Sequence, residues 1–213
     1  MSARIFHVDA FSEKPFRGNP ACVCLLGDEA SEQFMQDLAR EMNLPETAFL
    51  TRRREGYGLR WFSPETEVDL CGHATLASAH VLWETGIIPR SEKAVFNTRS
   101  GVLSASSRGE LIELDFPAVP ERRKAEPARL SEALGVKPKY TGKNKYDYLI
   151  EVESEDVLRS IKPDFGLLKT ISARGFIVTS ISDLLQYDFV SRFFAPSAGI
   201  NEDPVTGSAH CCL

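Results

Sequence analysis

The chain has 213 residues, of which 43% are hydrophobic and 26% charged, which is ordinary for a globular protein of one large or two small domains. Its net charge of −5 argues against a nucleic-acid partner, and no apolar run or signal-peptide core indicates a membrane or secretory segment. The five cysteines, an odd number without a secretory signal, indicate reduced thiols and a cytoplasmic protein.

Hydrophobic periodicity and turn residues predict the elements of the first half. Residues 31–42 carry apolar side chains at helical spacing, and the following Asn-Leu-Pro ends that helix because the residue before a proline resists helical geometry. Residues 72–85 form the clearest predicted helix, with Gly86 as its C-terminal cap. The predicted strands are 5–10, 21–26, 48–51, 58–62, 94–98, 102–106 and 111–116.

Prolines and a charged run between Pro117 and Pro127 interrupt this pattern. We therefore divide the chain into an N-terminal half, residues 1–117, and a C-terminal half, residues 118–213. For the second half the pattern predicts helices at 130–134 and from 154, and strands at 146–152, 175–180 and 187–194.

One composite motif occurs twice, at residues 60–74 and 192–210. Each copy reads as an apolar strand, a loop with proline, an acidic residue, and a glycine that opens an Ala-rich helix. The repeat predicts two equivalent halves. If both helix starts face one cleft, their free N–H groups and dipoles would hold a small carboxylate there. The chain stops a few residues into the second helix, so we expect the second half to be incomplete.

Two residues of the first half are candidates for acid/base chemistry. Glu46 lies among apolar neighbours at a helix-to-strand junction, where burial would raise its pKa toward neutrality. The alternative is a glutamate on an exposed turn. His73 lies at a predicted helix start, which favours a neutral imidazole that hydrogen-bonds a ligand, and the alternative is a capping or core histidine.

The remaining candidates are suited to binding an anion or to assisting proton transfer. Asp203 precedes a proline and is biased to an extended conformation, although a capping role is about as plausible. Gly72, Gly207 and Ser208 offer backbone N–H groups and a hydroxyl to a carboxylate or enolate oxygen. Asn19 lies in a tight loop and is a weaker candidate, because a plain turn is the favoured interpretation of this segment.

Common cofactor motifs are missing from the sequence. It has no GxxxxGK[ST], GxGxxG, GxSxG or HExxH, and its four histidines and five cysteines do not fall at metal-ligand spacing. We therefore expect no nucleotide, flavin or metal cofactor.

Five segments in order resemble the phenazine-biosynthesis isomerase (PhzF-like) family, which shares its fold with diaminopimelate epimerase. The segments are residues 9–11, 15–20, 43–49, 69–75 and 202–210, so the resemblance covers essentially the whole chain. It implies an α/β (α+β) fold of two pseudo-symmetric halves, each an antiparallel barrel-like sheet around a central helix, with the ligand in the cleft between them.

The resemblance also implies cofactor-free proton transfer on a small carboxylate, and a homodimer. Glu46 matches the family's proton-moving glutamate, and His73, Asp203, Gly207 and Ser208 match residues that position the substrate and assist proton movement. Specificity would then depend on aromatic cleft walls, for which the candidates are Phe16, Phe62 and Phe194.

Two alternatives stay open at this point. One is a binding or protein-interaction module that keeps the cleft without turnover. The other is a two-thiol amino-acid epimerase, which needs a cysteine at each helix start. Cys71 occupies the first position but Thr206 occupies the second, so the thiol-pair mechanism is disfavoured.

Overall fold

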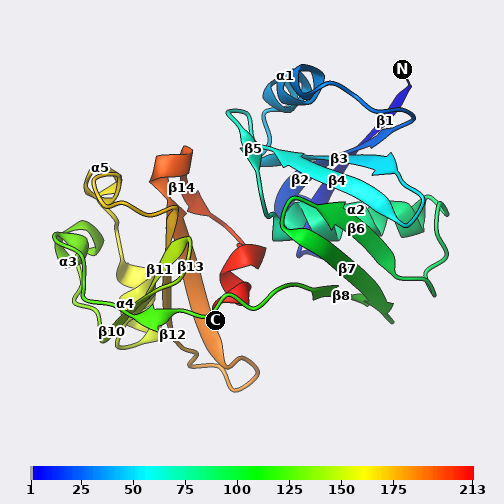
Figure 1. Cartoon of the computed structure of the whole chain (residues 1–213). Coiled ribbons are helices and arrows are strands. Elements are labelled where there is room, and N and C mark those ends of the chain that lie inside the picture. Colours follow the sequence, from blue (N-terminus) through cyan, green and yellow to red (C-terminus); the bar gives the residue numbers. More distant parts are fainter. Residues whose placement is uncertain (1) are drawn as a thin grey trace. The chain divides into compact units, whose positions relative to one another are not determined.

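The computed structural model describes residues 2–213, which divide into two compact units (Figure 1). Unit 1 ends at Pro117, and unit 2 runs from Ala118 to Leu213. No helix among the described residues has the length and apolar character needed to cross a membrane.

Unit 1 is built on one eight-stranded sheet with the order β1-β2-β3-β4-β6-β7-β8, in which β5 also pairs with β4. Most neighbours are antiparallel, but β2 and β3, and β4 and β6, are parallel because a helix connects the two strands of each pair. The strands are β1 (Ala3–Ala10), β2 (Asn19–Leu26), β3 (Glu46–Arg52), β4 (Tyr57–Phe62), β5 (Glu67–Val68), β6 (Ala94–Thr98), β7 (Gly101–Arg108) and β8 (Leu111–Asp115).

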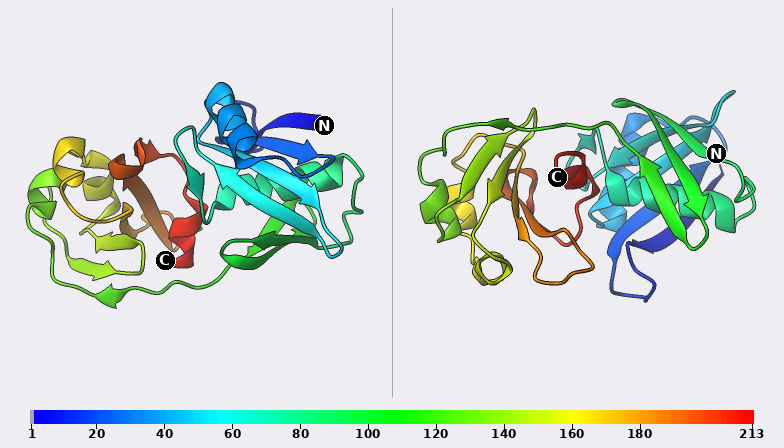
Figure 2. Two further views of the ribbon diagram at one scale, coloured as in Figure 1. Left: turned by 45° about the horizontal axis from the view of Figure 1, so that its top comes forward. Right: turned by 90° about the horizontal axis from the view of Figure 1, so that it is seen from below.

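The two helices of unit 1 pack in different ways. Helix α1 (Glu32–Met42) buries only Met35 and Ala39, and Ser31 caps its start by accepting a hydrogen bond from the Phe34 N–H. Helix α2 (Gly72–Glu84) is apolar on nearly all sides and buries most of its residues. Figure 2 shows α2 against the inner face of the curled sheet. The predicted central helix of the first half is therefore confirmed.

Unit 2 contains a six-stranded sheet with the order β14-β13-β12-β11-β10-β9. Its strands are β9 (Arg122–Arg123), β10 (Tyr140–Lys143), β11 (Asp147–Glu151), β12 (Gly175–Ile181), β13 (Phe189–Ala195) and β14 (Ile200–Asp203). Its helical segments are α3 (Leu130–Leu134), α4 (Glu155–Ser160), α5 (Phe165–Leu168) and the 3₁₀ helices η1 (Pro196–Ala198) and η2 (Gly207–Cys211).

The two units repeat one topology. An antiparallel pair, β1-β2 or β10-β11, leads by a helical crossover to a parallel neighbour, β3 or β12. An antiparallel strand and a short edge strand follow, and a helical segment comes next, α2 or η2. This repetition confirms the predicted α/β fold of two pseudo-symmetric halves.

Two local predictions were wrong. The segment that Gly207 opens is a 3₁₀ helix instead of an Ala-rich α-helix, because so short a segment gains few hydrogen bonds from α geometry. Phe62 and Phe194 are 1% and 0% exposed and belong to hydrophobic clusters, so neither is available to a ligand. Only Phe16, 93% exposed, remains a candidate for contact with a ligand.

We expect Leu82→Ala to lower the free energy of unfolding by about 3 kcal/mol, because it leaves a cavity beside fully buried neighbours of α2. Leu111→Ala makes the same chemical change at a side chain of unit 1 that is 74% exposed, and should change stability by less than about 0.5 kcal/mol. Urea unfolding measures both. Equal losses would contradict the placement of α2 in the core.

Candidate functional site

Alternation along β2 and β3 decides which way two predicted site residues face. Ala48 and Leu50 pack in the core around α2, and Glu46, two residues earlier on β3, shares their face. On β2, Asn19 lies two residues before Ala21, which also packs in this core, so the two side chains share one face of the sheet. Because β2 and β3 are parallel, both side chains lie at the same end of the sheet. Asn19 is fully buried, and the Glu46 side chain is 13% exposed, so the exposed-turn interpretation of Glu46 does not hold.

The start of α2 brings an imidazole and a thiol to the same place. His73 is 3% exposed, and its Nε2 lies 3.4 Å from Oε2 of Glu46. Its Nδ1 lies 3.6 Å from Sγ of Cys71, the N-cap residue, whose backbone is extended. The imidazole ring therefore contacts both the carboxylate of Glu46 and the thiol of Cys71, and the three side chains form a compact cluster.

Burial lowers the pKa of His73 to about 4, and the nearby backbone of Pro20 only partly opposes this fall. The ring is therefore neutral at neutral pH, and its approach to Glu46 is not an ion pair. A neutral imidazole carries one N–H and one lone pair, so it can donate a proton on one side and accept one on the other.

The ligand atoms of Glu46, Cys71 and His73 all lie within 4.8 Å of one another, and their donor types are those that bind zinc. However, Nδ1 faces the thiol while Nε2 faces the carboxylate. A neutral imidazole that contacts both an acid and a thiol can donate to one and accept from the other. The cluster therefore has the groups that proton transfer requires, in addition to donor types that suit a metal ion.

The predicted residues of unit 2 lie at the end of β14 and the start of η2. Asp203 is half-buried, and its Oδ2 accepts a hydrogen bond of 2.6 Å from the Thr206 hydroxyl. Gly207 and Ser208 follow as the first residues of η2. Cys211 lies at the end of η2, so no thiol stands at its start, which further disfavours the two-thiol epimerase.

Sequence reasoning missed Arg174, which contacts one of these residues. Its Nη2 donates a hydrogen bond of 3.2 Å to the Ser208 hydroxyl oxygen. The same guanidinium forms a two-point ion pair with the fully buried Asp147, with Nε 2.9 Å from Oδ1. It also lies over the rings of Tyr146 and Phe193, at 5.1 and 5.8 Å from their centroids. Since Arg174 donates to the Ser208 oxygen, the hydroxyl hydrogen is left to point at another acceptor.

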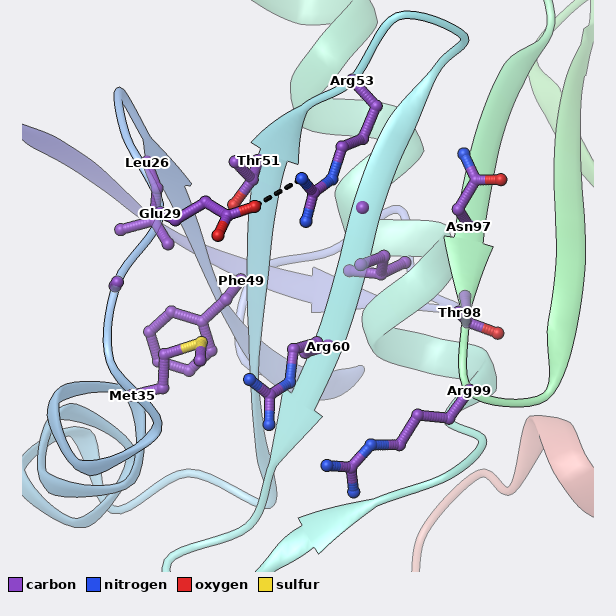
Figure 3. A pocket seen from close by; sticks show the side chains of 13 residues that line it. Leu26, Glu29, Met35, Phe49, Thr51, Arg53, Arg60, Asn97, Thr98 and Arg99 are labelled. Carbon is purple, nitrogen blue, oxygen red and sulfur yellow. Dashed lines mark hydrogen bonds and ion pairs between the residues drawn. The ribbon is translucent and has the colours of Figure 1, made fainter.

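A separate pocket of about 360 Å³ opens in unit 1 beside α1 (Figure 3). Met35 and Phe49 contribute to its apolar wall, and Arg53, Arg60 and Arg99 provide positive groups. None of the predicted site residues lines it. It lies on the face of the sheet opposite α2, because Phe49 packs with α1 and not in the core around α2.

Carboxylates neutralise each of these three guanidinium groups. Glu67 has a side chain only 6% exposed and pairs with both Arg60 and Arg99. The other pairs are Arg53 with Glu29, and Arg60 and Arg99 with Glu32. The pocket therefore has no excess positive charge with which to attract an anion.

The profile of the family described as "Phenazine biosynthesis-like protein" matches residues 8–213, nearly the whole chain. The chain belongs to this family. It is 55% identical over 214 residues to an uncharacterized isomerase of Halalkalibacterium halodurans, covering 100% of this chain and 81% of that protein.

Solved structures agree with this family assignment. A PhzF-family phenazine biosynthesis protein of Enterococcus faecalis superimposes with a TM-score of 0.90 at 42% identity, covering 100% of this chain and 80% of that one. A predicted epimerase of Pseudomonas aeruginosa superimposes with a TM-score of 0.70 at 19% identity, covering 98% and 79%. The second comparison shows only a shared fold, which is the epimerase-like fold expected from the sequence.

The lowered pKa of His73 predicts a loss of stability in acid. As the pH falls, the unfolded chain binds the proton first, near pH 6.5, and the folded protein binds it only near pH 4. Wild type should therefore lose up to about 3 kcal/mol between these pH values through this residue. Urea unfolding at pH 7 and pH 4 should show a smaller loss for His73→Gln, and an unchanged loss for the control His7→Gln. Equal pH dependence in all three proteins would contradict a buried neutral His73.

The ion pair between Arg174 and Asp147 predicts that removing one partner destabilises the protein more than removing both. We expect Arg174→Met to destabilise the protein by about 2 kcal/mol, because it leaves the carboxylate of Asp147 buried without its guanidinium. Arg174→Met/Asp147→Leu should recover most of this loss, since neither charge remains. Additive losses in urea unfolding would show that the two side chains do not interact.

Proposed function

We propose that this protein is a cofactor-independent isomerase that moves a proton within a small carboxylate substrate. Membership of a family whose relative is named an isomerase supports the class of reaction. The observation that carries the proposal is the cluster of Glu46, His73 and Cys71, in which a neutral imidazole lies 3.4 Å from a carboxylate.

Glu46 is the general acid/base in this proposal. Its carboxylate removes a proton from a substrate carbon, so that a C–H bond breaks and an O–H bond forms on Glu46. The electron pair delocalises toward the substrate carboxylate or a conjugated double bond. A proton then returns to a different carbon. The net change is an isomerisation without oxidation or reduction, and it requires no co-reactant.

His73 assists by positioning the Glu46 carboxylate and relaying its proton. With a pKa of about 4 it cannot store a proton at neutral pH, so its contribution is to donate and accept in the same step. In the tautomer that fits both contacts, Nε2–H faces Glu46, and Nδ1 accepts from the Cys71 thiol.

The other predicted residues have supporting roles in the proposal. Asp203 assists proton movement, and its hydrogen bond from Thr206 fixes its orientation. Asn19 and Gly72 are the proposed carboxylate-binding residues of unit 1, and Gly207 and Ser208 are those of unit 2. The contact from Arg174 supports the role of Ser208, because it leaves the hydroxyl hydrogen available to an anionic oxygen.

The test is exchange of solvent deuterium into substrate carbon. We would incubate the protein in D₂O with a panel of small hydroxy-, amino- and cyclohexadiene carboxylates, and follow deuterium entry by NMR and mass spectrometry. We expect exchange into one class of compound, and a loss of about 10²-fold or more in Glu46→Gln, which keeps the shape of the side chain and removes its basicity.

Glu41→Gln is the matched control, because Glu41 is exposed at the end of α1. It should exchange at the wild-type rate. If Glu46→Gln exchanges as fast as Glu41→Gln, Glu46 is not the acid/base group. If carboxylates bind but none exchanges, a binding module replaces the isomerase as the better account.

A further inference from the structure

Unit 2 contains a cavity of about 480 Å³ that includes neither Asp203 nor Gly207. Three segments form it: the turn between β10 and β11, the stretch from the end of α5 to the start of β12, and η1. Four of its nine lining residues are basic, and none is acidic. The basic residues are Lys143, Lys145, Lys169 and Arg174.

The charge at this cavity is not neutralised as it is in the pocket beside α1. Asp147 pairs with Arg174, but within residues 2–213 no carboxylate lies within 4.0 Å of the ammonium groups of Lys143, Lys145 or Lys169. Three positive charges therefore remain at one cavity in a chain whose net charge is −5. Such a concentration attracts a multiply charged anion.

Three of the four cations already contact neighbouring groups, and the ammonium group of Lys145 lies 4.9 Å from the centre of the Tyr146 ring. Lys143 donates a hydrogen bond of 3.0 Å to the Ser172 carbonyl, and its ammonium group lies 4.5 Å from the centre of the Tyr148 ring. Arg174 is fixed by Asp147 and by the aromatic rings on which it lies. Because these side chains are already ordered, less side-chain conformational entropy is lost when a ligand binds.

The remaining wall supplies further donors and an apolar base. Ser172 and Ser197 carry exposed hydroxyls, and Ile171 and the ring of Tyr146 are the larger apolar groups. The volume is within the range of small-molecule sites, which is about 300–1,000 Å³. The composition suits a compact anion attached to a small organic group.

We propose that this cavity binds a small phosphate-bearing molecule. Lysine ammonium groups bind phosphate as point charges from several directions, whereas a single carboxylate is matched better by one planar guanidinium. Here the only guanidinium already holds a carboxylate, and three lysines with hydroxyl donors remain for the ligand. The cavity does not include Glu46, and Arg174 is the lining residue that also contacts a residue of the proposed isomerase site, Ser208.

The test is titration of the full chain with sodium pyrophosphate at low ionic strength, followed by ¹⁵N–¹H NMR and calorimetry, with sodium acetate and sodium citrate as comparison anions. We expect saturable pyrophosphate binding that shifts the amide signals of residues 143–146 and 169–174. We expect weaker binding of citrate and none of acetate. Absence of saturation, shifts confined to other segments, or citrate bound as tightly as pyrophosphate would overturn the proposal.

Variants that remove lysines distinguish binding of pyrophosphate at the cavity from nonspecific electrostatic attraction to the protein. Lys145→Ala/Lys169→Ala removes two exposed lysines of the cavity, and should weaken pyrophosphate binding by about tenfold or more. Lys137→Ala/Lys162→Ala removes the same charge from exposed positions of unit 2 outside the cavity, and should change binding by less than about twofold. Equal weakening in the two variants, with unchanged urea midpoints, would show that net charge and not the cavity binds the anion.

Discussion

Helix α2 has no polar side wide enough to face water, and this constraint arranges the rest of unit 1. Its residues pack against strands from both ends of the sheet, so the sheet must curl around it. The buried hydroxyls of Thr75 and Ser78 bond to carbonyls of the same helical region, at 2.5 and 2.7 Å, so they need no solvent. With the helix enclosed, its first turn lies where β2 and β3 begin. That placement brings His73 to Glu46.

Enclosing the start of α2 buries His73, which lowers stability in acid and also gives the site a neutral imidazole. Burying His73 keeps its ring neutral, which sacrifices stability in acid but supplies a group that can donate and accept at neutral pH. Two basic regions show opposite arrangements of charge. Beside α1 each guanidinium has a carboxylate partner, whereas Lys143, Lys145 and Lys169 of unit 2 have no carboxylate partner within residues 2–213. Only the second arrangement creates a local field for an anion.

Local sequence signals predicted much of this structure. The repeated strand-loop-helix motif predicted two similar halves, and hydrophobic periodicity predicted α1 and α2 within one or two residues. Glu46 and His73 were proposed as site residues from their neighbours and from their place at element ends. The structure places them together, although their catalytic roles stay predictions.

Contacts that depend on tertiary pairing could not be predicted. The ion pair of Arg174 with Asp147 requires β11 and β12 to lie parallel with Asp147 beside Gly175, which no local pattern indicates. The approach of Cys71 to His73 depends on the extended backbone of the N-cap residue. Phe62 and Phe194 were misassigned because an aromatic strand residue faces either core or solvent according to the packing of its sheet.

The proposed chemistry depends on a neutral His73 that contacts both the Cys71 thiol and the Glu46 carboxylate. The most direct measurement is ¹⁵N NMR of the imidazole nitrogens of His73 at pH 7, in wild type and in Cys71→Ala. We expect a neutral ring with its hydrogen on Nε2 in wild type, and a changed Nδ1 signal when the thiol is removed. A ring with hydrogens on both nitrogens at pH 7, or an Nδ1 signal unaffected by the loss of the thiol, would contradict it.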